Sequence, residues 1–214
     1  ASTMASAGPE WRRDAGLALV GGLAWALALG WWQPGVGAGL DFVRLVAPYQ
    51  EFFRQSILHG ELPWWNPYAS LGRPFLADLQ ALGFYPATWL VLPFGVMGGW
   101  FVAATLHGAL GLWGFFRLGG SLEWSRGVAL LAGLAFLFSG PLAARMQAGQ
   151  VNYVYGLCYV PLILHLAWSF ARLPTRRGWV GLTFVWALQL LCGHPQVFWL
   201  TGLGSGLWVT GALA

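Results

Sequence analysis

Long apolar runs alternate with short polar segments along most of the chain. An α-helix rises about 1.5 Å per residue, so about 20 apolar residues cross the hydrocarbon core of a bilayer. Six runs approach this length and predict six transmembrane helices, at 15–33, 97–117, 127–144, 153–171, 178–193 and 196–213. A further run at 87–96 is too short and contains Pro93, so we place it at the membrane interface or as the lead-in to the second span.

The polar segment at 34–96 is too long for a simple turn, and it carries four of the seven acidic residues. Long connections in compact proteins are functional or disordered, and the aromatic content of this one argues against disorder. Pro48 is a favourable first helical position, and an aromatic face follows it until Gly60, which predicts a helix along the membrane surface. A second short helix is predicted to begin at Pro74.

Composition agrees with the span pattern, because 57% of the residues are hydrophobic and only 8% are charged. These values are typical of an all-α polytopic membrane protein. Arg12 and Arg13 before an apolar run ending in Ala26-Leu27-Ala28 are also a feature of signal peptides. Because the run continues through Trp31 and Trp32, we expect an uncleaved first span.

The arginines predict the orientation. They cluster before the first span, between the second and third, and between the fourth and fifth, so all three clusters fall on one side of the membrane. By the positive-inside rule that side is cytoplasmic. We therefore expect a cytoplasmic tail at 1–14, and we expect 34–96, 145–152 and 194–195 to face outward.

This orientation collects many polar residues on the outer side, near span ends or in the large loop. They are Asp41, His59, Asn66, Arg73, Asp78, Gln80, Arg145, Gln147, Gln150, Asn152, His194 and Gln196. Their convergence predicts an extracytoplasmic cleft for a polar ligand. Inside the spans, His107, His165 and Gln189 are functional candidates by position, although a neutral side chain hydrogen-bonded to a neighbouring carbonyl is the favoured interpretation.

Several chemistries have no support in the residue pattern. There is no Gly-rich nucleotide loop, no Ser-His-Asp pattern and no metal-ligand spacing, and we interpret Cys158 and Cys192 as packing residues. Partners are therefore expected among membrane lipids and other membrane subunits, with no nucleic acid. No cofactor is expected, and the pattern leaves a divalent cation open. Any donor used on the outer face would have to be carried by lipid.

Certain motifs resemble those of a known family. They are DFVRLVAPYQ from Asp41, HGELPWWNPY from His59, GRPFLADLQ from Gly72, FYP from Phe84, FLFSG from Phe136, GQ at Gly149, YVPL from Tyr159 and GHPQ from Gly193. In order and spacing they are similar to the YfhO-type bacterial membrane proteins, within the GT-C class of glycosyltransferases. The resemblance covers about residues 41–200.

The resemblance implies an enzyme of the bacterial cytoplasmic membrane that moves a sugar from a polyprenyl-phosphate carrier to an extracytoplasmic acceptor. In that class an acidic residue just after the first span is the catalytic base, and Asp41 matches it. Family members have about a dozen spans. This chain therefore corresponds to an N-terminal portion or to a shortened relative.

The residues themselves leave other roles open. Asp41 is also a favourable N-cap for a helix beginning at Phe42. Arg73 and Arg145 are suited either to anchor lipid headgroups or to hold the donor phosphate in a bidentate manner. The remaining substrate-binding candidates are Asn66, Gln80, His194 and Gln196, of which Asn66 also suits a turn and His194 also suits a span end.

Two further functions compete with the glycosyltransferase. A shortened relative that keeps the fold would serve as a non-catalytic structural subunit of a larger membrane complex. A transporter would need paired broken helices and charged groups near the midplane, and only His107 meets that description.

Overall fold

The computed structural model describes residues 10–30 and 39–213, and most of them form α-helices. The helices are α1 (Glu10–Ala28), α2 (Ala47–Leu58), α3 (Val91–Ser121), α4 (Arg126–Leu137), α5 (Gly140–Gln147), α6 (Val151–Cys158), α7 (Val160–Arg172), α8 (Arg176–Leu191) and α9 (Pro195–Leu213). One short hairpin joins β1 (Trp65–Asn66) to β2 (Arg73–Pro74), with Asn66 opposite Arg73. The predicted all-α class is therefore confirmed.

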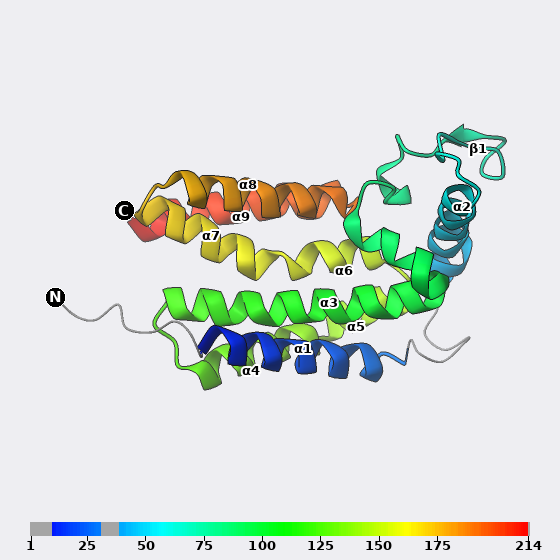
Figure 1. The fold of residues 1–214 in the computed structure, drawn as a ribbon. Helices are drawn as coiled ribbons and strands as arrows, with labels where there is room; N and C mark the ends of the chain where they lie inside the picture. Colours follow the sequence, from blue (N-terminus) through cyan, green and yellow to red (C-terminus); the bar gives the residue numbers. More distant parts are fainter. Residues whose placement is uncertain (1–9, 31–38, 214) are drawn as a thin grey trace.

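Most of the helices run along one long axis (Figure 1). Helix α2 and the hairpin lie across one end of this bundle, and the described beginning of α1 and the end of α9 lie at the other. We call these the loop end and the arginine end, because α1 begins, α3 leads into α4, and α7 leads into α8 at the second one. Those three places carry the predicted arginine clusters.

Three helical segments are long and apolar enough to cross a membrane, namely Leu79–Ser121, Arg126–Gln147 and Val151–Arg172. They contain the predicted runs 97–117, 127–144 and 153–171, and they indicate membrane insertion. The second contains a break at Ser139 between α4 and α5. The third is interrupted at Tyr159, where Pro161 removes a backbone donor from the first turn of α7.

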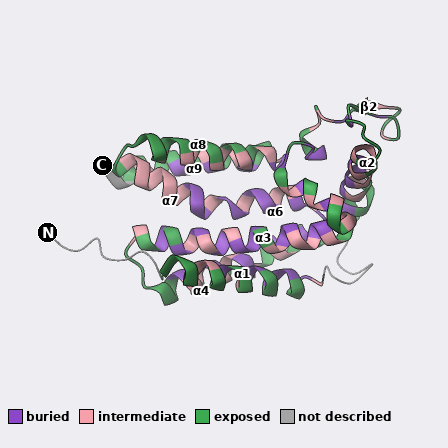
Figure 2. Cartoon of the chain, in the orientation of Figure 1, coloured by how far each residue is buried: buried purple, intermediate pink, exposed green. Residues whose placement is uncertain are grey.

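Helix α3 lies at the centre of the bundle and packs directly on α1. A Cβ atom on Gly22 would lie 2.3 Å from the carbonyl oxygen of Thr105, and one on Gly108 would lie 2.8 Å from the ring of Trp25. Small residues therefore let the two backbones touch, as in other tightly packed membrane helices. Figure 2 shows buried residues along α3 and α6, whereas much of α4 and α8 is exposed.

Two helices begin at residues other than those predicted. Helix α1 begins at Glu10, inside the segment predicted as a tail. Before α3, a 3₁₀-helix at Pro86–Leu90 leads into a helix that is kinked at Gly95, where φ is 69° and ψ is 175°. The run at 87–96 is therefore the lead-in to the second span. The expected end of the first span, at residues 31–33, lies outside the described residues.

The helix predicted between Pro48 and Gly60 forms as α2, which follows a π-helical turn at Phe42–Val46. Its aromatic face packs within the loop, where Tyr49 and Phe53 contact Phe75 in a small second core. Gln50 of α2 is polar but only 3% exposed, because α2 also packs against α3.

The second loop helix, predicted from Pro74, does not form. Arg73 and Pro74 pair with β1 as a strand, and helical geometry begins only with a 3₁₀ turn at Leu79–Ala81. The carboxylate of Asp78 accepts a hydrogen bond from the Gln80 amide at 3.0 Å and so begins that turn. Pairing with β1 overrides the preference of Pro74 to begin a helix.

Candidate functional site

A cleft of about 210 Å³ lies at the loop end of the bundle. Four of the predicted site residues line it, namely Asp41, Gln80, Arg145 and His194. Gln150, Asn152 and Tyr153 complete its polar wall. The lining comes from the segment before α2, the 3₁₀ turn, the last turn of α5 with the connection to α6 and the first turn of α6, and the turn from α8 to α9.

Two glycines with positive φ bring these segments into backbone contact. Gly149 has a φ of 86°, and a Cβ atom there would lie 2.3 Å from the Phe42 nitrogen. Gly193 has a φ of 74°, and its Cβ atom would lie 2.2 Å from the Leu79 carbonyl oxygen. Glycine alone fits both conformations without strain. Each glycine is followed directly by a polar residue of the cleft, so the close contacts position Gln150 and His194.

An amide joins the two opposite charges of the cleft. Arg145 donates a hydrogen bond of 2.5 Å to Oε1 of Gln150, and Nε2 of Gln150 donates one of 3.2 Å to Oδ2 of Asp41. Among the described residues, neither Asp41 nor Arg145 forms an ion pair. Both side chains are exposed, so each has hydrogen-bonding capacity left for a ligand.

The helix-cap role considered for Asp41 is not realised. Its backbone is already helical, with φ of −66° and ψ of −34°, and its carboxylate makes no capping hydrogen bond. The backbone amide of Asp41 instead donates to the carbonyl oxygen of Ala148 at 3.3 Å. The carboxylate is thereby held beside Gln150.

Aromatic contacts position the remaining polar groups. The guanidinium of Arg145 lies 5.0 Å from the ring centroid of Tyr153, and the Tyr153 and His194 rings meet edge to face at 4.9 Å. Burial and the charge of Arg145 lower the pKa of His194 below its ordinary value, which favours the neutral ring. Nδ1 of His194 and Oδ1 of Asn152 are buried without a hydrogen-bond partner among the described residues. Such atoms are available to a polar ligand.

Arg73 lies outside the lining of this cleft, and its guanidinium is already engaged. It pairs with Oδ2 of Asp78 at 2.9 Å and donates to the hydroxyl of Tyr49 at 2.9 Å. These contacts join the hairpin to α2 and to the 3₁₀ turn. The structure therefore separates Arg73 from Arg145, although both were predicted as phosphate ligands.

Asn66 and Gln196 also lie outside the lining. Asn66 is buried in the hairpin, and its Oδ1 accepts a hydrogen bond of 2.9 Å from the Tyr68 amide, as a turn residue does. Gln196 is exposed in the first turn of α9. The structure does not bring either residue together with Asp41.

Three polar lining residues, Gln150, Asn152 and Tyr153, were not assigned to the site from the sequence. Gln150 and Asn152 belong to the predicted outward group, so their proximity to Arg145 was the available signal. Tyr153 begins an apolar run, and nothing in its local pattern distinguishes it from a packing residue. Only the fold shows that its ring lies between Arg145 and His194.

The polar residues inside the bundle have local partners. Nδ1 of His107 donates to the Ala103 carbonyl at 2.6 Å, so its Nε2 accepts from the hydroxyl of Tyr85, which also hydrogen-bonds the Tyr159 hydroxyl. Gln189 donates to the Gly156 carbonyl at 2.9 Å. These contacts agree with the packing interpretation of both residues.

No group of three or more His, Cys, Asp or Glu side chains suited to a metal ion occurs in residues 10–30 and 39–213. Cys158 and Cys192 are buried and free. The chain matches no family model, no curated protein and no solved structure.

Proposed function

We propose that the chain acts as a membrane glycosyltransferase that moves a sugar from a polyprenyl-phosphate donor to an extracytoplasmic acceptor. The observation that carries this proposal is the Asp41–Gln150–Arg145 arrangement in the cleft. A carboxylate and a guanidinium stand close together without neutralising one another. Transfer from a phosphate carrier needs one group of each kind.

The proposed topology has six spans, formed by α1, α3, α4 with α5, α6 with α7, α8 and α9. Three arginine-rich places support it, namely the beginning of α1, the connection from α3 to α4 and the connection from α7 to α8. All three lie at one end of the bundle, opposite α2 and the cleft. The arginine end would face the cytoplasm. The cleft would then open on the outer side of the bacterial cytoplasmic membrane.

In the proposed reaction, the acceptor hydroxyl attacks the anomeric carbon of the sugar. Its proton passes to the carboxylate of Asp41, a new C–O bond forms, and the C–O bond to the carrier phosphate breaks. The phosphate leaves with the electron pair, and the guanidinium of Arg145 stabilises its negative charge through charge-assisted hydrogen bonds. Gln150 holds both groups in place.

The size of the cleft limits what binds there. Sites for drug-sized ligands usually measure about 300–1,000 Å³, whereas this cleft measures about 210 Å³. It therefore suits a sugar ring and its phosphate. The prenyl chain of the donor would remain in the surrounding lipid.

Replacement of Asp41 tests the proposal. A positioned general base typically contributes 10²- to 10⁴-fold, so Asp41→Asn should lower the turnover of sugar transfer by about that factor. Transfer of radiolabelled sugar from a polyprenyl-phosphate donor is measured in vesicles, with the protein expressed from its complete reading frame.

Glu61→Gln is the matched control, because Glu61 is an exposed acid of the same loop that does not line the cleft. This variant should keep most of the activity. Near-normal transfer by folded Asp41→Asn protein would remove the catalytic role and favour a structural subunit.

A further inference from the structure

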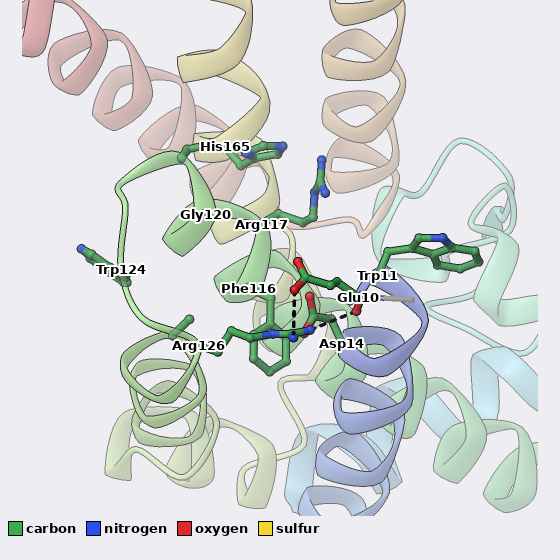
Figure 3. Close-up of a pocket in the computed structure, with 11 residues that line it drawn as sticks. Glu10, Trp11, Asp14, Phe116, Arg117, Gly120, Trp124, Arg126 and His165 are labelled. Atoms are coloured by element: carbon green, nitrogen blue, oxygen red, sulfur yellow. Dashed lines mark hydrogen bonds and ion pairs between the residues drawn. The ribbon is translucent and has the colours of Figure 1, made fainter. Parts of the chain in front are cut away.

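A second pocket, of about 440 Å³, lies at the arginine end of the bundle (Figure 3). The beginning of α1, the end of α3, the beginning of α4 and the side of α7 form its walls. It is separate from the cleft at the loop end. Two carboxylates, two guanidinium groups and one imidazole line it, and they are those of Glu10, Asp14, Arg117, Arg126 and His165.

Two carboxylates and one guanidinium of this pocket form ion pairs, and in the described part of the chain the other guanidinium does not. Nη2 of Arg126 lies 2.5 Å from Oδ1 of Asp14, and its Nη1 lies 3.8 Å from Oε1 of Glu10. Both carboxylates are therefore engaged by one arginine. Arg117 forms no ion pair among the described residues, so neither carboxylate of the pocket occupies its guanidinium.

Polar groups and tryptophans accompany this cation. Figure 3 shows Arg117 on the side of His165, away from the contacts of Arg126. The Nδ1 atom of His165 hydrogen-bonds the Ser121 hydroxyl at 2.7 Å, which fixes the ring. Trp11 and Trp124 line the same pocket and are 52% and 39% exposed. Tryptophan is enriched where a membrane meets water, so its presence places the pocket at headgroup depth.

We infer that this pocket binds a phosphate-bearing group, and that the headgroup of an anionic membrane lipid supplies it. A guanidinium binds phosphate oxygens in a bidentate manner, and Arg117 is free to do so. The volume exceeds that of a phosphate alone, and Phe116 and Ala129 provide an apolar part of the wall for the adjoining glycerol. Anionic lipids also gather near cationic membrane-proximal residues. This site does not depend on catalysis at the cleft.

Lipid binding to the purified full-length protein tests the inference. The probe is fluorescent phosphatidylglycerol in micelles of a maltoside detergent, which contains no phosphate. Hydrogen bonds to charged groups contribute about 1.5–3 kcal/mol, so Arg117→Gln should weaken binding by about tenfold or more. Arg117→Lys, which keeps the charge but loses the bidentate geometry, should give an intermediate affinity.

Arg176→Gln is the matched control, because Arg176 is an exposed arginine at the same end that does not line the pocket. Its affinity should stay within about twofold of the wild type. Equal losses of lipid affinity in Arg117→Gln and Arg176→Gln would mean that the positive charge of this end attracts anionic lipid in general, and would overturn the site. An unchanged affinity in folded Arg117→Gln protein would overturn it as well.

Inorganic phosphate distinguishes the two sources of the phosphate group. If a lipid headgroup is the ligand, inorganic phosphate should not displace the fluorescent lipid. The phosphate concentrations are kept low enough that the general effect of salt on binding does not change. Arg117-dependent binding of inorganic phosphate in maltoside micelles without lipid would overturn the lipid as the source and assign the pocket to free phosphate.

Discussion

At the loop end of the bundle, Gly149 and Gly193 bring backbones into direct contact, whereas at the arginine end Arg126 joins α1 to α4 through side-chain ion pairs. This difference decides which charged side chains remain available to a ligand at each end. Backbone contact holds the cleft together without using its carboxylate or guanidinium. At the other end Arg126 engages both carboxylates of the pocket, and the second arginine of that pocket, Arg117, forms no ion pair among the described residues.

The same contrast separates two arginines of the loop end. Arg73 is bound to Asp78 and Tyr49 and holds the hairpin against α2. Among the described residues, the guanidinium of Arg145 is held by the amide of Gln150 and by the face of Tyr153. An arginine that is positioned by neutral groups keeps its charge for a ligand, so the two residues should differ in function.

The largest expected effect comes from breaking the backbone contact of the cleft. In Gly149→Ala the new Cβ atom would lie 2.3 Å from the Phe42 nitrogen, at a φ of 86°. The left-handed conformation costs about 1–2 kcal/mol and the displaced backbone adds to it, so we expect the free energy of unfolding to fall by roughly 3 kcal/mol. Thermal unfolding in detergent measures the loss, and sugar transfer should fall with it.

Gly60→Ala provides the control for this change. Gly60 has a φ of 77°, but a Cβ atom there would have no neighbour within 4 Å. Its substitution should therefore cost only about 1–2 kcal/mol, from the backbone conformation alone. If both variants were equally stable, close contact at Gly149 would not be what holds the cleft.

The next effect concerns Arg145 and Arg73. Arg145→Gln removes the only cation that lines the described cleft, so the Michaelis constant for the lipid donor should rise by about 10- to 100-fold while the fold is kept. Arg73→Gln breaks the ion pair with Asp78 and should mainly loosen the hairpin. Donor titrations in vesicles, together with proteolysis of the loop, separate the two outcomes. Equal rises in both variants would contradict the distinction.

Patterns that depend on local spacing were readable from the sequence. Apolar runs predicted the helical class and six spans, and three of those six runs lie in segments able to cross a membrane. An aromatic face after Pro48 predicted the helix α2. Polar residues near the ends of these runs predicted a cleft, and four of the assigned side chains do line one. The signals for the helices lie within a few turns of one element, and the prediction of the cleft follows from the side of the membrane to which the ends of the runs were assigned.

Features that need contact between distant segments were not readable. Pro74 favours a helix start by itself, and only pairing with Asn66 and Trp65 makes it part of a strand. The partner of Arg73 depends on how the loop folds back. Gly149 gives no local sign that Phe42 will lie against it. Tertiary packing selects among local preferences at all three places.

The smallest expected effect is at the arginine end, where exposed ion pairs replace backbone contact. Arg126→Gln removes the contacts to Asp14 and Glu10, but all three side chains reach solvent, which screens such pairs. The midpoint of thermal unfolding should fall slightly at low salt, and the difference from the wild type should shrink at high salt. Arg12→Gln is the control, because Arg12 has no carboxylate partner among the described residues and should change the midpoint at neither salt concentration. A fall in the unfolding midpoint as large as that of Gly149→Ala would contradict the contrast, because the two ends would then be held with similar strength. A fall that high salt does not reduce would contradict it as well.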